Sequence, residues 1–162
     1  MTHFKETQSF RQPWLMAVLA LVVGLPLYGL YEQFGVGSPW GDNPLSDQGL
    51  LIYAAVTVVF ALWLLGMNLE TRVEDHAVIV KFHWLWPEKS FPMSEIVEAE
   101  ARSYRPIREY GGWGVRWGRS GRAFNVSGNQ GVELMLANGR RVMIGSQQPE
   151  KLHRAVAERL SH

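Results

Sequence analysis

Two long apolar blocks lie in the first half of the chain. Residues 13–31 and residues 50–69 contain no Asp, Glu, Lys, Arg or His, whereas charged residues are frequent from Glu70 onward. A helix rises 1.5 Å per residue, so about 20 residues span the hydrocarbon thickness of a bilayer. A helix in the core of a soluble protein would show a polar face, and neither block has one. The pattern therefore predicts two transmembrane helices, 13–31 and 50–69.

The residues around these blocks predict their orientation. Lys5 and Arg11 precede the first block, the connecting residues 32–49 contain no Lys or Arg, and the other fourteen basic residues follow the second block. Basic residues favour the cytoplasmic side of a membrane. We therefore expect a cytoplasmic N-terminal tail over residues 1–12, an external loop over 32–49, and both termini in the cytoplasm. No small-residue cleavage site follows the first block, so we expect it to be retained as a helix of a multi-pass inner-membrane protein.

The pattern changes to short alternating runs in residues 70–162. Strands are predicted for residues 77–82, 96–101, 131–136 and 140–144. Asn138-Gly139 predicts a tight hairpin turn between the last two. Pro149 opens a final helix with Leu152, Val156 and Leu160 on one face. Strands followed by one helix predict a compact, mostly β domain with a helical cover.

Three segments of this domain carry a resemblance to a known family. Residues 89–97 (KSFPMSEIV), 104–116 (YRPIREYGGWGVR) and 142–152 (VMIGSQQPEKL) resemble small bacterial membrane proteins with pleckstrin-homology-like domains. The resemblance implies a PH-like β barrel capped by the last helix and attached to a membrane anchor. It implies no activity, and the lipid-binding residues of eukaryotic relatives have no match here.

The glycine-rich segment 111–122 invites comparison with a phosphate-binding loop, because glycines let backbone N–H groups approach an anion. It does not fit a nucleotide motif, since the spacing from Gly114 to Gly118 is one residue short and Arg119 stands where Lys is required. Three interpretations are open: an irregular structural loop, an anion or head-group site, or a contact with another protein.

Six arginines lie within 21 residues of this part of the chain. Arginine makes multidentate contacts with phosphate, so such a cluster next to a membrane can bind anionic lipid head groups. Glu98, Glu100 and Glu109 lie nearby and can neutralise part of it, which leaves a solvated basic face as the alternative. The arginines are Arg102, Arg105, Arg108, Arg116, Arg119 and Arg122.

The segment Trp84-Leu85-Trp86 lies at a predicted turn, where polar residues are usual. Tryptophans suit a membrane interface, because the ring is apolar and its N–H is polar. These residues either contact the bilayer or pack against the protein itself.

Other classes of site find little support in the sequence. The five histidines show no metal-ligand spacing and there are no cysteines, so we expect no metal site and no disulfide. We expect no cofactor, and a net charge of +1 does not favour nucleic-acid binding. No nucleophile-elbow motif is present, and we expect no enzymatic activity. The sequence favours a membrane-anchored, non-enzymatic binding or scaffolding module on the cytoplasmic face. The alternatives are an accessory subunit of a larger membrane complex and, third, an enzyme of unknown class.

Overall fold

The computed structural model describes residues 1–118 and 121–161 of the chain. They divide into two units, which are considered separately. Residues 10–66 form the first, which we call the helical hairpin. Residues 1–9 and the residues from Met67 onward form the second, which we call the β domain. The helical hairpin is thus inserted into the sequence of the β domain.

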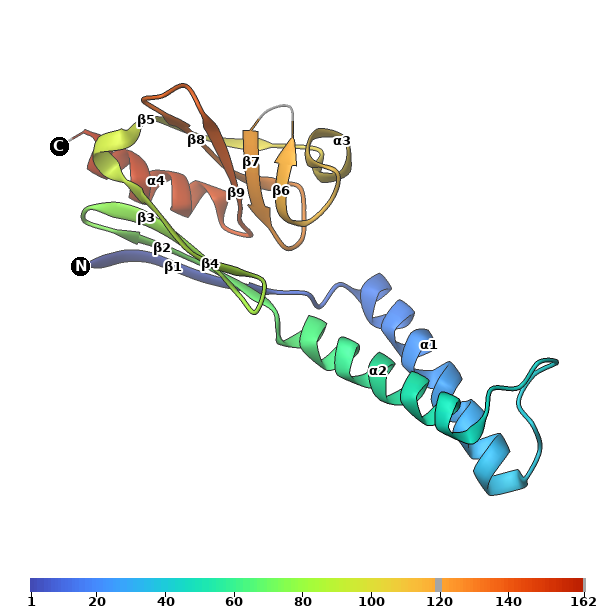
Figure 1. The fold of residues 1–162 in the computed structure, drawn as a ribbon. Helices are drawn as coiled ribbons and strands as arrows, with labels where there is room; N and C mark the ends of the chain where they lie inside the picture. Colours follow the sequence, from blue (N-terminus) through green and yellow to red (C-terminus); the bar gives the residue numbers. More distant parts are fainter. Residues whose placement is uncertain (119–120, 162) are drawn as a thin grey trace. The chain divides into compact units, whose positions relative to one another are not determined.

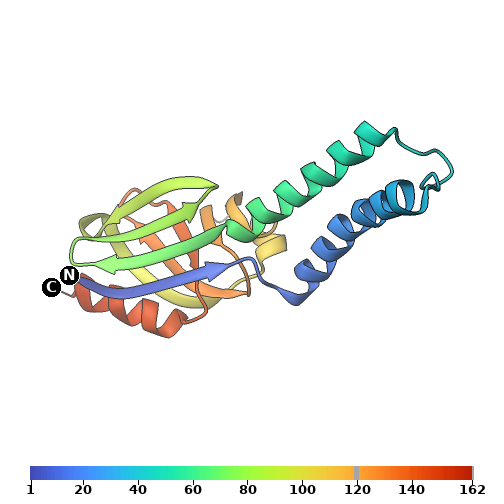
Figure 2. The same ribbon diagram turned by 90° about the horizontal axis from the view of Figure 1, so that it is seen from below.

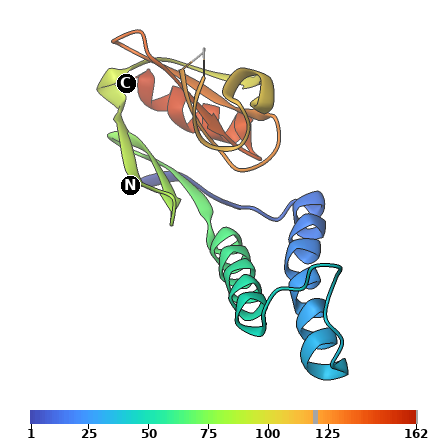
Figure 3. The ribbon, with the colours of Figure 1, turned by 45° about the vertical axis from the view of Figure 1, so that its right-hand side comes forward.

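The helical hairpin consists of α1 (Pro13–Leu30), a π-helical turn η1 (Tyr31–Val36) and α2 (Asp47–Gly66). The two long helices lie side by side (Figure 3). Both are long and apolar enough to cross a bilayer. Pro13 occupies the first turn of α1, where its missing N–H costs nothing. The second helix ends at Gly66 instead of the predicted residue 69, because Asn68 and Leu69 already belong to a strand in which Leu69 is fully buried.

The first sheet of the β domain contains β1 (Thr2–Ser9), β2 (Asn68–Glu74), β3 (Ala77–His83) and β4 (Trp86–Pro92), antiparallel and in that order. Figure 2 shows β1 beside β2, although 58 residues separate Ser9 from Asn68 in the sequence. Residues 2–9 are therefore an edge strand, and the expectation of a tail over residues 1–12 is wrong.

Polar side chains on β1 explain why its pattern did not reveal a strand. Its buried positions are Phe4, Glu6 and Gln8, so the inward face lacks the apolar alternation typical of a half-buried strand. The Glu6 carboxylate accepts hydrogen bonds from the Ser146 hydroxyl at 2.5 Å and the Gln147 N–H at 2.8 Å. The Gln8 amide donates to the carbonyl of Gly145 at 2.8 Å. These bonds attach β1 to the end of β9 and to the residues that follow it.

The second sheet has five strands in the order β5-β8-β9-β7-β6. They are β5 (Ile96–Ser103), β6 (Gly114–Gly118), β7 (Gly121–Asn125), β8 (Gln130–Leu136) and β9 (Arg141–Gly145). Strands predicted at 77–82, 96–101, 131–136 and 140–144 are confirmed, as is the turn at Gly139, whose φ of 77° suits glycine. The predicted irregular loop over 111–122 is mostly the β6–β7 hairpin.

The two sheets pack face to face in the β domain, with Phe91 of β4 against Phe124 of β7 at 6.2 Å between ring centroids. Helix α4 (Pro149–Leu160) contacts β5 and β8 of one sheet and β1 and β2 of the other (Figure 1). Leu152 and Val156 are fully buried, which confirms the predicted face of this helix. Two short helices, η2 (Met93–Glu95) and α3 (Pro106–Tyr110), complete the domain.

The barrel expected from the resemblance is not closed. After β4 the chain crosses through η2 to β5, which lies at the distant edge of the second sheet, so β4 pairs with β3 alone among the described strands. Pro87 and Pro92 lack the N–H that a further ladder would require. Helix α4 covers one side of the space between the sheets, and the side next to β4 stays open.

Candidate functional site: a basic cleft and an aromatic tip

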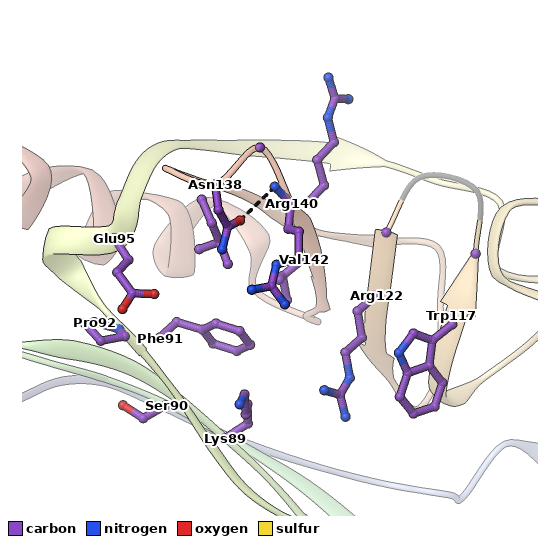
Figure 4. Close-up of a pocket in the computed structure, with 15 residues that line it drawn as sticks. Lys89, Ser90, Phe91, Pro92, Glu95, Trp117, Arg122, Asn138, Arg140 and Val142 are labelled. Carbon is purple, nitrogen blue, oxygen red and sulfur yellow. Dashed lines mark hydrogen bonds between the residues drawn. The ribbon is translucent and has the colours of Figure 1, made fainter.

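A cleft of about 900 Å³ opens between β4 and the β7–β9 side of the second sheet. Figure 4 shows side chains from both sheets around it. Phe91 and Val142 supply apolar walls, and Lys89, Arg122 and Arg140 supply positive charge. Glu95 is the carboxylate among the residues that line the cleft. Charges in a partly apolar cleft interact more strongly than charges in bulk water.

Arg122 is held among aromatic rings. Its guanidinium carbon lies 4.9 Å from the ring centroid of Trp86, 4.7 Å from that of Trp117 and 4.7 Å from that of Phe124. Trp86 and Trp117 also contact each other edge to face, with centroids 5.5 Å apart. The rings attract the cation through their negative faces, but they accept no strong hydrogen bond from it. Rings from β4, β6 and β7 thus hold one guanidinium in place.

The Arg122 guanidinium lacks an anionic partner within residues 1–118 and 121–161. Its Nε and Nη2 atoms are buried without a hydrogen-bond acceptor. Burial lowers the pKa of Arg122 from its ordinary value. An arginine stays charged in a protein, so this partly desolvated cation is unsatisfied in the structure.

The backbone positions Arg122 through two local features. Gly121 has a φ of 115°, and a side chain there would collide with the carbonyl oxygen of Arg141. Glycine therefore lets β7 approach β9 closely. Arg122 is the cross-strand partner of Trp117 and the register partner of Val142, so these three side chains share the face that looks toward the first sheet.

Lys89 and Arg140 approach the same cleft from other elements. Lys89 lies two residues before the buried Phe91 on β4, and residues two apart in a strand share a face. Arg140 follows the turn at Gly139, with its backbone N–H donating to the Asn138 side chain at 3.0 Å. Neither side chain forms a salt bridge with any residue that the structure describes. Sequence reasoning missed both residues, because they are distant from the arginine cluster in the chain.

Arg102 has the opposite environment. It donates to Glu133 at 2.8 Å and to Glu109 at 3.1 Å, and Glu133 also accepts from Arg141 at 3.4 Å. Burial alone would lower the pKa of Arg102, but the hydrogen bonds to Glu133 and Glu109 outweigh it and raise the pKa. For Glu109, burial raises the carboxyl pKa, but the Arg105 N–H and the Arg102 guanidinium together lower it. Two arginines and two carboxylates form a neutral group here.

The six predicted arginines do not form one surface. Arg102, with Glu133, and Arg116, with Ala123, belong to the outer face of the second sheet, whereas Arg122 belongs to the inner face. Arg116 donates to the carbonyl of Trp113 at 2.9 Å. Arg105 and Arg108 lie at the short helix α3, and Arg119 lies outside the described residues.

Residues 104–114 hold the second sheet together. The Asn125 amide donates to the Tyr104 hydroxyl at 3.0 Å and accepts from the Gly114 N–H at 3.0 Å. Burial raises the pKa of Tyr104 to about 12, so its hydroxyl stays protonated at neutral pH. Tyr104 and Tyr110 pack edge to face beneath Ala123 and Met143. These residues have a structural role.

The predicted turn at Trp84-Leu85-Trp86, which we call the aromatic tip, joins β3 to β4. Trp84 is 76% exposed and has a φ of 64°, a conformation that L-residues with bulky side chains rarely adopt. Leu85 is also exposed. Trp86 instead contacts Trp117 and Arg122, so only part of the tip is free to meet another surface.

Across the described residues, no group of three or more His, Asp or Glu side chains is arranged to hold a metal ion. No protein-family model matches the chain, and no curated protein matches it either. The cleft and the aromatic tip are therefore interpreted from their own geometry.

Proposed function

We propose that the chain is a membrane-anchored, non-enzymatic binding module. In this proposal α1 and α2 cross the inner membrane as a hairpin, and the β domain lies at the cytoplasmic surface with its aromatic tip among the lipid head groups. The observation that carries the proposal is the insertion of the helical hairpin between β1 and β2, which are paired neighbours in one sheet.

The strand register places both connections to the helices at one end of the first sheet. Ser9 pairs with Asn68, and Asn68 pairs with His83. Residues 10–12 lead from β1 to α1, and Met67 alone separates α2 from β2. Both connections therefore leave the same end of the first sheet, and the aromatic tip follows directly after His83 at that end.

Paired strands restrict the topology of the hairpin. The chain must return to within one strand spacing, about 5 Å, of the point where it left the sheet. Two helices that cross a bilayer once each satisfy this condition, because the start of α1 and the end of α2 then lie on the same side of the membrane. The basic residues before α1 and after α2 favour the cytoplasm for that side.

The proposal retains the pleckstrin-homology-like classification of the β domain. Two packed, mostly antiparallel sheets followed by one amphipathic helix support it, and the open side of the sheets distinguishes this domain from a closed barrel. A cleft that combines unpaired cations with apolar walls supports a binding role.

Single-cysteine labelling tests the topology directly, since the natural chain has no cysteine. Asp42→Cys, Thr2→Cys and Glu158→Cys are introduced separately, and intact spheroplasts are treated with a membrane-impermeant maleimide. We expect Asp42→Cys to react in intact cells, and the other two only after lysis. Labelling of Thr2→Cys and Glu158→Cys from opposite sides would contradict the proposal, as would labelling of Asp42→Cys only after lysis.

A further inference from the structure

We propose that the cleft between β4 and the β7–β9 side binds a phosphate group through Arg122, Lys89 and Arg140. This inference deepens the proposed binding function by naming the class of ligand. It does not depend on the membrane topology, because all three residues belong to the β domain.

The charge of the cleft favours a dianion. Lys89, Arg122 and Arg140 line it without salt-bridge partners among the described residues, and Glu95 supplies one negative charge. Arg141 also lines the cleft, but it is paired with Glu133. The three free cations and Glu95 leave a net charge of +2 (3 − 1). A phosphomonoester carries roughly −1.5 to −2 at neutral pH, whereas a single carboxylate carries about −1.

Arg122 gives the cleft its specificity. Trp86, Trp117 and Phe124 surround its guanidinium, whose central carbon lies 4.7 to 4.9 Å from the three ring centroids. A guanidinium that is already held in place loses little side-chain entropy when it donates to a phosphate, and its charge strengthens the hydrogen bond. Figure 4 shows Arg122 extending from β7 toward the space next to β4 and Lys89.

An acidic peptide is the competing ligand, because β4 is an exposed edge strand that another strand can join. The sequence of β4, Trp-Pro-Glu-Lys-Ser-Phe-Pro, argues against this mode. Its two prolines cannot donate to a new ladder, and prolines and lysines are the residues that protect edge strands from pairing. Side-chain recognition of a compact anion is therefore favoured over strand addition.

Two sources can supply the phosphate: a soluble phosphate compound, or the head group of an anionic lipid. Trp86 belongs to the aromatic tip and contacts Trp117 and Arg122, which line the cleft, so one end of the cleft is near the part of the domain proposed to meet the bilayer. The experiment separates the two sources.

The full chain is placed in nanodiscs of phosphatidylcholine, and inorganic pyrophosphate is added at constant ionic strength. Thermal unfolding and tryptophan fluorescence report binding, because Trp86 and Trp117 flank Arg122. A second arm replaces about a third of the lipid with phosphatidic acid. We expect a saturable rise in Tm in at least one arm. A rise in Tm with pyrophosphate alone indicates a soluble ligand, and a rise with phosphatidic acid alone indicates a lipid head group.

Matched variants test the residues. Arg122→Gln should weaken binding about ten- to hundredfold, since charged hydrogen bonds are lost, and its Tm without ligand should equal or exceed that of the wild type. Arg122→Lys should recover part of the affinity. Arg108→Gln removes an exposed arginine outside the cleft and should change nothing. Three results would overturn the proposal: no saturable response in either arm, equal losses in Arg122→Gln and Arg108→Gln, or tighter binding of triglutamate than of pyrophosphate.

Discussion

The two ends of the first sheet differ in their connections to the helices and in the side chains that they expose. One end, which we call the tip end, holds Ser9, Asn68 and His83, the connections to α1 and α2, and the aromatic tip. The other, which we call the far end, holds Thr2 and the Glu74-Asp75-His76 turn. Strands of seven residues place the two ends roughly 20 Å apart. The domain is therefore polarised along its strands.

The far end is polar, and its carboxylates are paired with cations. Hydrogen bonds from the Met1 ammonium and the His3 ring hold the pKa of Asp75 at about 2. Its carboxylate thus stays ionised throughout the physiological range. The Glu74-Asp75-His76 turn has no apolar side chain to insert into a bilayer, whereas the exposed Trp84 at the tip end suits the head-group region. The covalent attachment and the surface chemistry therefore both support the orientation that we propose.

Removing β1 is the largest change that breaks the comparison, because this strand connects the tip end to α1. The test uses a variant, called the linker variant, in which a short Gly-Ser linker replaces residues 10–66. Deleting Thr2–Ser9 from it should lower the free energy of unfolding by roughly 4 to 5 kcal/mol. Burial of Phe4 accounts for about 2 kcal/mol, and the three hydrogen bonds of Glu6 and Gln8 for about 1 kcal/mol each. Urea unfolding followed by circular dichroism measures the loss. Equal midpoints with and without the strand would show that β1 is not part of the domain.

Truncating Trp84 sharpens the comparison at the level of lipid contact. In the linker variant, Trp84→Ala should weaken binding to vesicles of phosphatidylcholine and phosphatidylglycerol about tenfold, since about 1.4 kcal/mol of apolar burial is lost. Co-sedimentation measures it. Ile107→Ala removes a side chain of similar exposure, 69%, outside the tip and serves as the control. Equal effects of the two substitutions would argue against a specific contact.

The strain at Trp84 predicts a smaller effect of opposite sign on stability. Asparagine tolerates a positive φ better than tryptophan does. Trp84→Asn should therefore raise the free energy of unfolding by about 0.5 to 1 kcal/mol while it weakens lipid binding. Chemical denaturation of the linker variant measures the change. A loss of stability would mean that the Trp84 ring stabilises the fold through packing.

The sequence predicted those elements in which one residue type dominates a face. The two apolar blocks, four strands and the last helix needed only hydrophobic periodicity. It did not predict β1, because Glu6 and Gln8 satisfy their hydrogen bonds with residues about 140 positions away. It grouped Arg102 and Arg116 with Arg122, although the strand register places the first two on the outer face of the second sheet and Arg122 on the inner face. It omitted Lys89 and Arg140 from the cleft, because only the tertiary fold brings them close to Arg122.

Spin labelling of the full chain tests the central claim most directly, namely that the tip end rests on the bilayer and the far end faces water. Leu85→Cys and His76→Cys are each labelled with a nitroxide in nanodiscs that contain anionic lipid. Collision rates are then measured with oxygen, which concentrates in lipid, and with a water-soluble nickel chelate. The account predicts that the label at position 85 collides preferentially with oxygen and the label at position 76 with the nickel chelate. Equal preference for the nickel chelate at both positions would contradict it.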